Sequence, residues 1–133
     1  MEEVNETVDI NVQESVEQLI EEMDARIHNQ LNEAKISDPA IQCISREATQ
    51  IRRLIQDSRD RSMVELIKLI EICLYRILFC GPQKQRHGLR LISAALVAIK
   101  HHQKQSDYLF DENRIADAAL TLWSWLDRSS YNS

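Results

Sequence analysis

The sequence predicts an all-α protein, folded as a single bundle of about five helices, and three observations lead to this class. The 133 residues include two glycines and two prolines, whereas a β-sandwich or barrel needs a turn about every 8–12 residues. Aromatic residues make up 5% of the chain, which is low for a protein built from strands. Apolar residues make up 44%, recur at the three- and four-residue spacing of amphipathic helices, and suffice for one buried core.

The N-terminal part of the chain predicts an antiparallel helical hairpin. Residues 1–11 are acidic and lack apolar periodicity, so we expect a flexible arm there. A first stripe at helical spacing follows: Val12, Val16, Leu19, Ile20, Met23, Ile27, Leu31 and Ala34. Pro39 suits the first position of a second helix and Asp38 can cap its free amides. The second stripe is Ile41, Ile44, Ala48, Ile51 and Ile55. Two narrow stripes with a short connection are typical of a hairpin with a coiled-coil-like seam.

Residues 62–80 predict a central helix packed against this hairpin. Ser62 and Glu65 have the spacing of a capping box. The segment that follows is apolar on nearly every face of a helix, and such a helix is expected to be buried on all sides. Gly81 and Pro82 are expected to end it, because proline cannot continue a helix.

Two further helices complete the predicted bundle. The fourth is expected to begin within residues 83–89 and to end near Lys104. The fifth is expected to have Asp111 as its N-cap, with Phe110 and Ile115 forming a hydrophobic staple around it. The apolar stripe of this last helix is Ile115, Ala118, Ala119, Leu122 and Leu126.

We expect one helical domain over residues 12–128, followed by a polar tail at 129–133.

The charges are segregated along the chain. The net charge is −5, but residues 1–38 hold 11 acids and 2 bases, and so carry −9. Residues 39–104 hold 5 acids and 12 bases, and so carry +7, while residues 105–133 carry −3. A basic middle segment keeps polyanion binding open as a function, although the whole chain is acidic.

The anion-binding candidates are six basic residues in this middle segment. Four of them cluster within an arc of about 80° on the fourth predicted helix: Arg86, Arg90, Lys100 and Lys104. Arg52 and Arg53 belong to a second basic cluster that extends to Arg61. Such ridges can follow nucleic-acid phosphates. The alternatives are a solvated helix face, or an internal partner for the acidic first helix.

The candidates for binding a protein partner are two tryptophans and the acidic face of the first helix. Trp123 and Trp125 lie about 80° to either side of the fifth helix's apolar stripe, so we expect both to be half buried. Tryptophan is enriched among the residues that dominate protein interfaces. Glu14, Glu17 and Glu21 lie opposite the apolar stripe of the first helix and could meet a basic partner.

No motif of catalysis, cofactor binding or metal binding stands out. The sequence lacks G-x-S-x-G, H-E-x-x-H, a phosphate-binding glycine loop and the EF-hand calcium loop. We therefore expect no catalytic residue, no cofactor, no metal and no small-molecule substrate. The longest apolar stretch, residues 69–80, falls short of the ~20 residues of a membrane span. Three cysteines and no secretory signal pattern predict an intracellular protein, cytoplasmic or nuclear, and not a secreted one.

Two hypotheses of function follow from these observations. The first is a non-enzymatic interaction module, such as an adaptor, a regulator or a subunit of a larger assembly. Self-association is one form of it, because the narrow seam of the hairpin also suits a second copy of the chain. The alternative is binding of nucleic acid or another polyanion through the basic residues of the middle segment.

Overall fold

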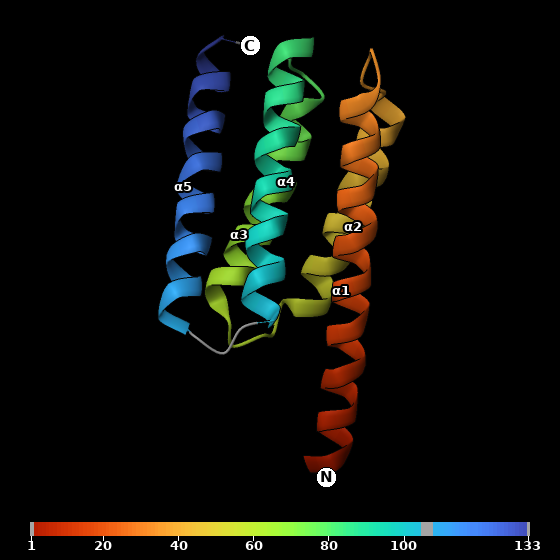
Figure 1. The fold of residues 1–133 in the computed structure, drawn as a ribbon, viewed down its shortest axis with the longest axis vertical. Coiled ribbons are helices and arrows are strands. Elements are labelled where there is room, and N and C mark those ends of the chain that lie inside the picture. Colours follow the sequence, from red (N-terminus) through yellow and green to blue (C-terminus); the bar gives the residue numbers. More distant parts are fainter. Residues whose placement is uncertain (1, 105–107, 133) are drawn as a thin grey trace.

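The computed structural model contains five helices that alternate in direction along the molecule (Figure 1). It describes the backbone of residues 2–104 and 108–132, and the side chains of residues 12–102 and 114–128. The helices are α1 (Glu2–Asn32), α2 (Asp38–Ile55), α3 (Arg61–Ile77), α4 (Pro82–Lys104) and α5 (Tyr108–Asn132). The described residues contain no strand, and the prediction of a single helical bundle is confirmed.

The first four helices form a closed ring, and the fifth packs on one side of it. Within the described residues, α1 contacts α2 and α4, and α3 also contacts both α2 and α4. Helix α5 lies against α3 and α4 (Figure 1). Helices α3 and α4 therefore have three helical neighbours each, whereas the other helices have two.

Helix α1 begins earlier than its apolar stripe predicts. Its backbone is helical from Glu2, where we expected an arm followed by a helix from Val12. Its N-terminal end projects beyond the other helices (Figure 1). The predicted stripe is buried at Val16, Ile20, Met23 and Ile27, but its last member, Ala34, is exposed and follows the end of the helix.

Helices α1 and α2 form the predicted antiparallel hairpin (Figure 1). All five residues of the α2 stripe are buried. The N-cap of α2 is Ser37, not Asp38, which lies inside the first turn. The backbone N–H of Ser37 donates to Oε1 of Gln30 at 2.9 Å, so a side chain of α1 fixes the connection between the two helices.

Helix α3 differs from its prediction at both ends. Its N-cap is Asp60, whose carboxylate accepts a hydrogen bond from the backbone N–H of Met63 at 3.2 Å. The predicted capping box of Ser62 and Glu65 is therefore wrong, because an aspartate two residues earlier satisfies the free amides. The helix ends at Ile77, and a turn leads through Cys80 to the next helix.

Helix α4 begins at Pro82, and helix α5 begins at Tyr108, ahead of the predicted N-cap Asp111. One glycine determines how closely these two helices pack. A Cβ atom added at Gly88 would lie 2.8 Å from the ring of Trp125 and 3.0 Å from the side chain of Ile77. Only glycine leaves room at this position for the close contact between α3, α4 and α5.

Candidate interaction surface

The most prominent surface feature is a group of exposed apolar side chains on two helices that contact each other, α3 and α5, and on the turn after α3. Seven large apolar residues are exposed among the described side chains, and five of them belong to α3, the turn after it, and α5. These five define what we call the α3/α5 face: Ile72 (49% exposed), Tyr75 (66%), Phe79 (63%), Leu120 (65%) and Trp123 (57%). The exposure of Ile72, Tyr75 and Phe79 contradicts the prediction that residues 62–80 are wrapped on all sides.

The α3/α5 face exists because α3 has more apolar faces than helical neighbours. Its buried side chains point toward α2, α4 and α5. Ile72 and Phe79 are seven residues apart and therefore share one line along the helix or its extension. Tyr75 lies beside them, with its ring centroid 5.3 Å from that of Phe79. No described helix covers this line of apolar residues.

A groove of about 470 Å³ lies along the boundary between α3 and α5. Leu69 and Ile72 line it from α3, while Ala116, Ala119 and Trp123 line it from α5. The two alanines are too small to fill the space between the helices, so the groove lies directly beside the protruding indole of Trp123. An apolar floor beside an aromatic anchor is typical of the buried centre of a protein interface.

One end of the groove is charged. Glu65 lies 3.6 Å from Nη2 of Arg61 and 3.6 Å from Nζ of Lys68, and all three side chains are at least 43% exposed. Exposed ion pairs of this kind contribute little to the free energy of unfolding. They form a polar edge beside the α3/α5 face, as charged residues do at the rim of many interfaces.

The two tryptophans have different surroundings. Trp123 is 57% exposed, as the prediction of a boundary residue requires, but Trp125 is only 3% exposed. The prediction for Trp125 is wrong because α4 packs on that side of α5, where Gly88 admits the indole ring. On the other side of α5, Trp123 lines the groove beside α3 and stays exposed.

The acidic candidates lie on the outer side of α1. Glu14 and Glu17 are exposed. Glu21 is also exposed, with its Oε1 atom 3.6 Å from Nζ of Lys100 on α4. The structure brings Glu21 together with a predicted anion-binding residue and places neither near Trp123, which lies on α5.

Arg86 binds the backbone of the neighbouring helix. Its guanidinium donates to the carbonyl oxygens of Leu31 at 3.0 Å and Ala34 at 2.9 Å, and also to that of Glu33. These carbonyls belong to the end of α1 and to the residues just after it, where a helix lacks partners for its last carbonyl groups. A cation there also interacts favourably with the helix dipole. Arg86 thus stabilises the end of α1.

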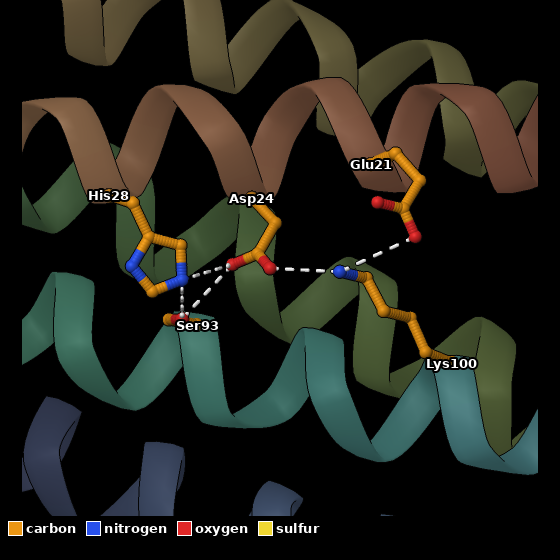
Figure 2. A network of polar contacts seen from close by, with 5 residues as sticks. All are labelled: Glu21, Asp24, His28, Ser93 and Lys100. Atoms are coloured by element: carbon orange, nitrogen blue, oxygen red, sulfur yellow. Dashed lines mark hydrogen bonds and ion pairs between the residues drawn. The ribbon is translucent and has the colours of Figure 1, made fainter.

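Lys100 belongs to a polar network between α1 and α4 (Figure 2). Its Nζ atom donates to Oδ2 of Asp24 at 2.8 Å, and both side chains are largely buried. Ser93 on α4 donates to Oδ1 of the same carboxylate at 3.0 Å. Burial lowers the pKa of Lys100, but the bonds and charges of Asp24 and Glu21 outweigh it, so the pKa lies above its usual value. Of the alternatives given for the basic residues, Lys100 fits the internal partner of the acidic first helix, because it pairs with Asp24 and Glu21 of α1.

The network contains serine, histidine and aspartate, but not in the geometry of a hydrolase triad. In a triad, the two ring nitrogens of histidine face the serine and the aspartate separately. Here Nε2 of His28 faces both Asp24 at 3.3 Å and Ser93 at 3.5 Å. Ser93 is buried and its hydroxyl donates directly to Asp24. The three residues therefore join two helices instead of activating a nucleophile.

The other basic candidates are dispersed. Arg52 on α2 lies 2.6 Å from a carboxylate oxygen of Glu71 on α3, which also accepts a hydrogen bond from Thr49. Arg53 and Arg90 are exposed on α2 and α4. The side chain of Lys104 lies outside the described residues. The ridge predicted on the fourth helix thus has two members, Arg86 and Lys100, that are engaged within the chain.

A second groove, of about 540 Å³, lies between α1 and α2. Five of its seven lining residues are polar or charged, and the other two are Leu19 and Leu54. Leu54 is 38% exposed, and it is the only large apolar side chain exposed on the described part of the hairpin. This groove has no aromatic residue among its lining side chains, unlike the groove on the α3/α5 face.

The thiol groups and the carboxylates form no recognisable site in the described part of the chain. Burial raises the pKa of the Cys73 thiol to about 12, so this thiol is inert at neutral pH. Cys43 and Cys80 are partly exposed, and all three cysteines are free. Among the described residues, no group of three or more metal-binding side chains comes together.

Comparisons with known proteins leave the function to be argued from this geometry. No family model, no curated protein and no solved structure matches the chain. Over the described residues, none of the helices combines the length and the hydropathy that crossing a membrane requires.

Proposed function

We propose that this protein is a non-enzymatic interaction module that binds another polypeptide chain through the α3/α5 face. The observation that supports this most is the group of five large apolar side chains, each about half exposed or more, on adjacent elements. The largest apolar patch on a typical monomer covers about 300–600 Å² and is often functional. Three aromatic residues in one such patch are a composition typical of interface centres.

The shape of this face suits a polypeptide better than a small ligand. The groove follows the helices, is open to solvent and has charged residues at one end. Small-molecule sites are concave and enclose most of their ligand's surface. A helix or a flat apolar surface can instead cover Ile72 and Trp123 together while its polar edge meets Lys68 and Glu65. An intracellular location is part of this proposal and agrees with the three free thiols.

Site-specific photo-crosslinking in the native cell tests the proposal. The photoreactive residue p-benzoylphenylalanine is placed at Trp123 in one variant and at Ile72 in another. We expect discrete crosslinked products at both positions. The matched control places the same residue at Thr121, which is exposed on the opposite side of α5. Absence of any product at Trp123 and Ile72, or equal products at Thr121, would contradict the proposal.

Polyanion binding is the second candidate, and the exposed guanidinium groups of Arg53 and Arg90 favour it. Three of the six candidates already have acceptors inside the chain: Arg52, Arg86 and Lys100. Binding to duplex DNA that weakens steeply with salt, and is lost when Arg53 and Arg90 are replaced by glutamate, would support this function. We rank it second, because cations engaged within the chain are less available for phosphates.

A further inference from the structure

We infer that the chain covering the α3/α5 face is a second copy of this protein, related to the first by a two-fold axis. This inference rests on the proposed function and names its partner. A two-fold interface joins the same surface on both copies, so the surface has to be complementary to itself. Three features of the α3/α5 face meet this requirement.

The first feature is that the face contains both a protrusion and a hollow. Trp123 is 57% exposed and stands at the edge of the groove, whose floor includes Ala116 and Ala119. A two-fold axis near this edge would place each Trp123 in the groove of the other copy. Indole rings in well-packed pockets are frequent hot spots of protein interfaces.

The second feature is the area available for burial. Aromatic side chains offer about 150–250 Å² each. Tyr75, Phe79 and Trp123 are 57–66% exposed, so together they present roughly 300–450 Å² per copy. Pairing of two copies would bury about 600–900 Å² through these rings alone. Ile72 and Leu120 bring the total close to the ~1,200 Å² at which stable specific interfaces begin.

The third feature is the charge balance. The charged side chains that line the groove are Arg61, Lys68 and Glu65, which already pair with one another. By contrast, residues 1–38 carry −9, and two copies that met through α1 would bring like charges together. The α3/α5 face is therefore a better self-association surface than the seam of the hairpin, which the sequence suggested for this role.

Sedimentation equilibrium of the full chain, from micromolar to near-millimolar concentration, tests the inference. We expect a concentration-dependent rise from the chain mass of 15.5 kDa to twice that mass. Trp123→Ser and Ile72→Glu act from different helices, and each should raise the dimer dissociation constant about tenfold or more, as truncation of a hot spot does. Both positions are exposed, so helicity and thermal midpoint should stay close to those of the parent protein.

Two matched controls separate this face from the hairpin. Leu54→Ser removes the exposed apolar side chain of the α1/α2 groove, and Gln42→Glu adds the same charge as Ile72→Glu at an exposed position of α2. Neither should change the dissociation constant. A dimer weakened by Leu54→Ser but not by Trp123→Ser would overturn the inference.

Failure of the inference and failure of the proposed function give different results. A monomer at every concentration, or a dimer that persists in both Trp123→Ser and Ile72→Glu, overturns the second copy as the partner. The proposed function then still stands if photo-crosslinking at Trp123 joins a different protein. The proposed function itself is contradicted if crosslinking at Trp123 and Ile72 gives no product of any mass.

Discussion

The hairpin α1–α2 and the pair α3–α5 use their apolar residues in different ways. In the hairpin, each helix has one apolar stripe, and the neighbouring helices bury it, as at Ile20 and Ile44. Helix α3 has apolar residues around nearly its whole circumference, but only three helical neighbours in the described structure. The surplus includes Ile72 and Tyr75, which remain exposed. An excess of apolar faces over available neighbours thus distinguishes the proposed docking surface from the structural core.

The largest expected effect comes from truncating a buried side chain of α3 and comparing the loss of stability with that of an exposed one. Leu74 is fully buried, whereas Ile72 on the same helix is 49% exposed. We expect Leu74→Ala to lower the free energy of unfolding by about 2–5 kcal/mol, because it leaves a cavity in the core. Ile72→Ala should change the stability of the monomer by no more than about 0.5 kcal/mol. Urea denaturation at low protein concentration measures both, and a similar loss in the two variants would refute the division of α3 into two sides.

The next largest loss of stability is expected from breaking the polar contact between α1 and α4. Asp24→Asn keeps the shape of the side chain but leaves the largely buried ammonium of Lys100 without its closest carboxylate. We expect a loss of about 2–3 kcal/mol, somewhat below the cost of breaking a fully buried pair. The exposed pair of Glu65 provides the comparison, since Glu65→Gln should cost less than about 1 kcal/mol. Urea denaturation measures both variants. Equal losses of the free energy of unfolding would contradict the larger contribution expected of the α1/α4 network.

The two glycines compare a tightly packed position with an open one: Gly88 packs against Trp125 of α5, whereas Gly81 lies in the turn before α4. In Gly88→Ala, the new methyl group would meet Trp125 and Ile77. We expect a loss of about 1–3 kcal/mol from overpacking. Gly81→Ala has nothing within 4 Å of the added carbon, so its effect should be neutral or slightly stabilising. Thermal unfolding followed by circular dichroism compares them, and an unchanged midpoint for Gly88→Ala would contradict the close packing of Trp125 on α4.

The smallest effect expected is a pH dependence from Lys100. Its pKa in the folded protein lies above the ordinary value of 10.5, so the folded state binds the proton more tightly than the unfolded state. The stabilisation is complete below pH 10.5 and is lost as the pH rises through the higher pKa of the folded state. The free energy of unfolding of the parent protein should therefore fall more steeply above this pH than that of Lys100→Met. Parallel curves for the two proteins would contradict the raised pKa.

The sequence predicted the five helices well because their apolar stripes determine which side is buried. Their ends were less predictable. Asp60 competes with Ser62 as the N-cap of α3, and both are residues that cap well. Helix α5 also starts earlier than expected, at Tyr108 and not after Asp111. Caps of similar quality within a few residues of each other cannot be ranked by local pattern alone.

The candidate site was only partly predictable. Trp123 was placed correctly at the surface, but Trp125 was not, since the two lie symmetrically about the stripe and only the position of α4 distinguishes them. The exposure of Ile72 and Phe79 was missed, although Glu65 and Lys68, seven and four residues before Ile72, place charged side chains on the same side of the helix. These charged residues were the available signal, because charged side chains at helical spacing mark the side of a helix that faces solvent.

The environment of Trp123 at increasing protein concentration tests the central claim most directly. In the Trp125→Phe variant, the only remaining indole reports on the α3/α5 face. If a second copy covers this face, the emission of Trp123 should shift to the blue and become shielded from acrylamide as the concentration rises, with the same midpoint as the dimer mass. An indole that stays equally accessible to acrylamide while the protein dimerises would contradict the claim, and so would one that stays accessible because no dimer forms.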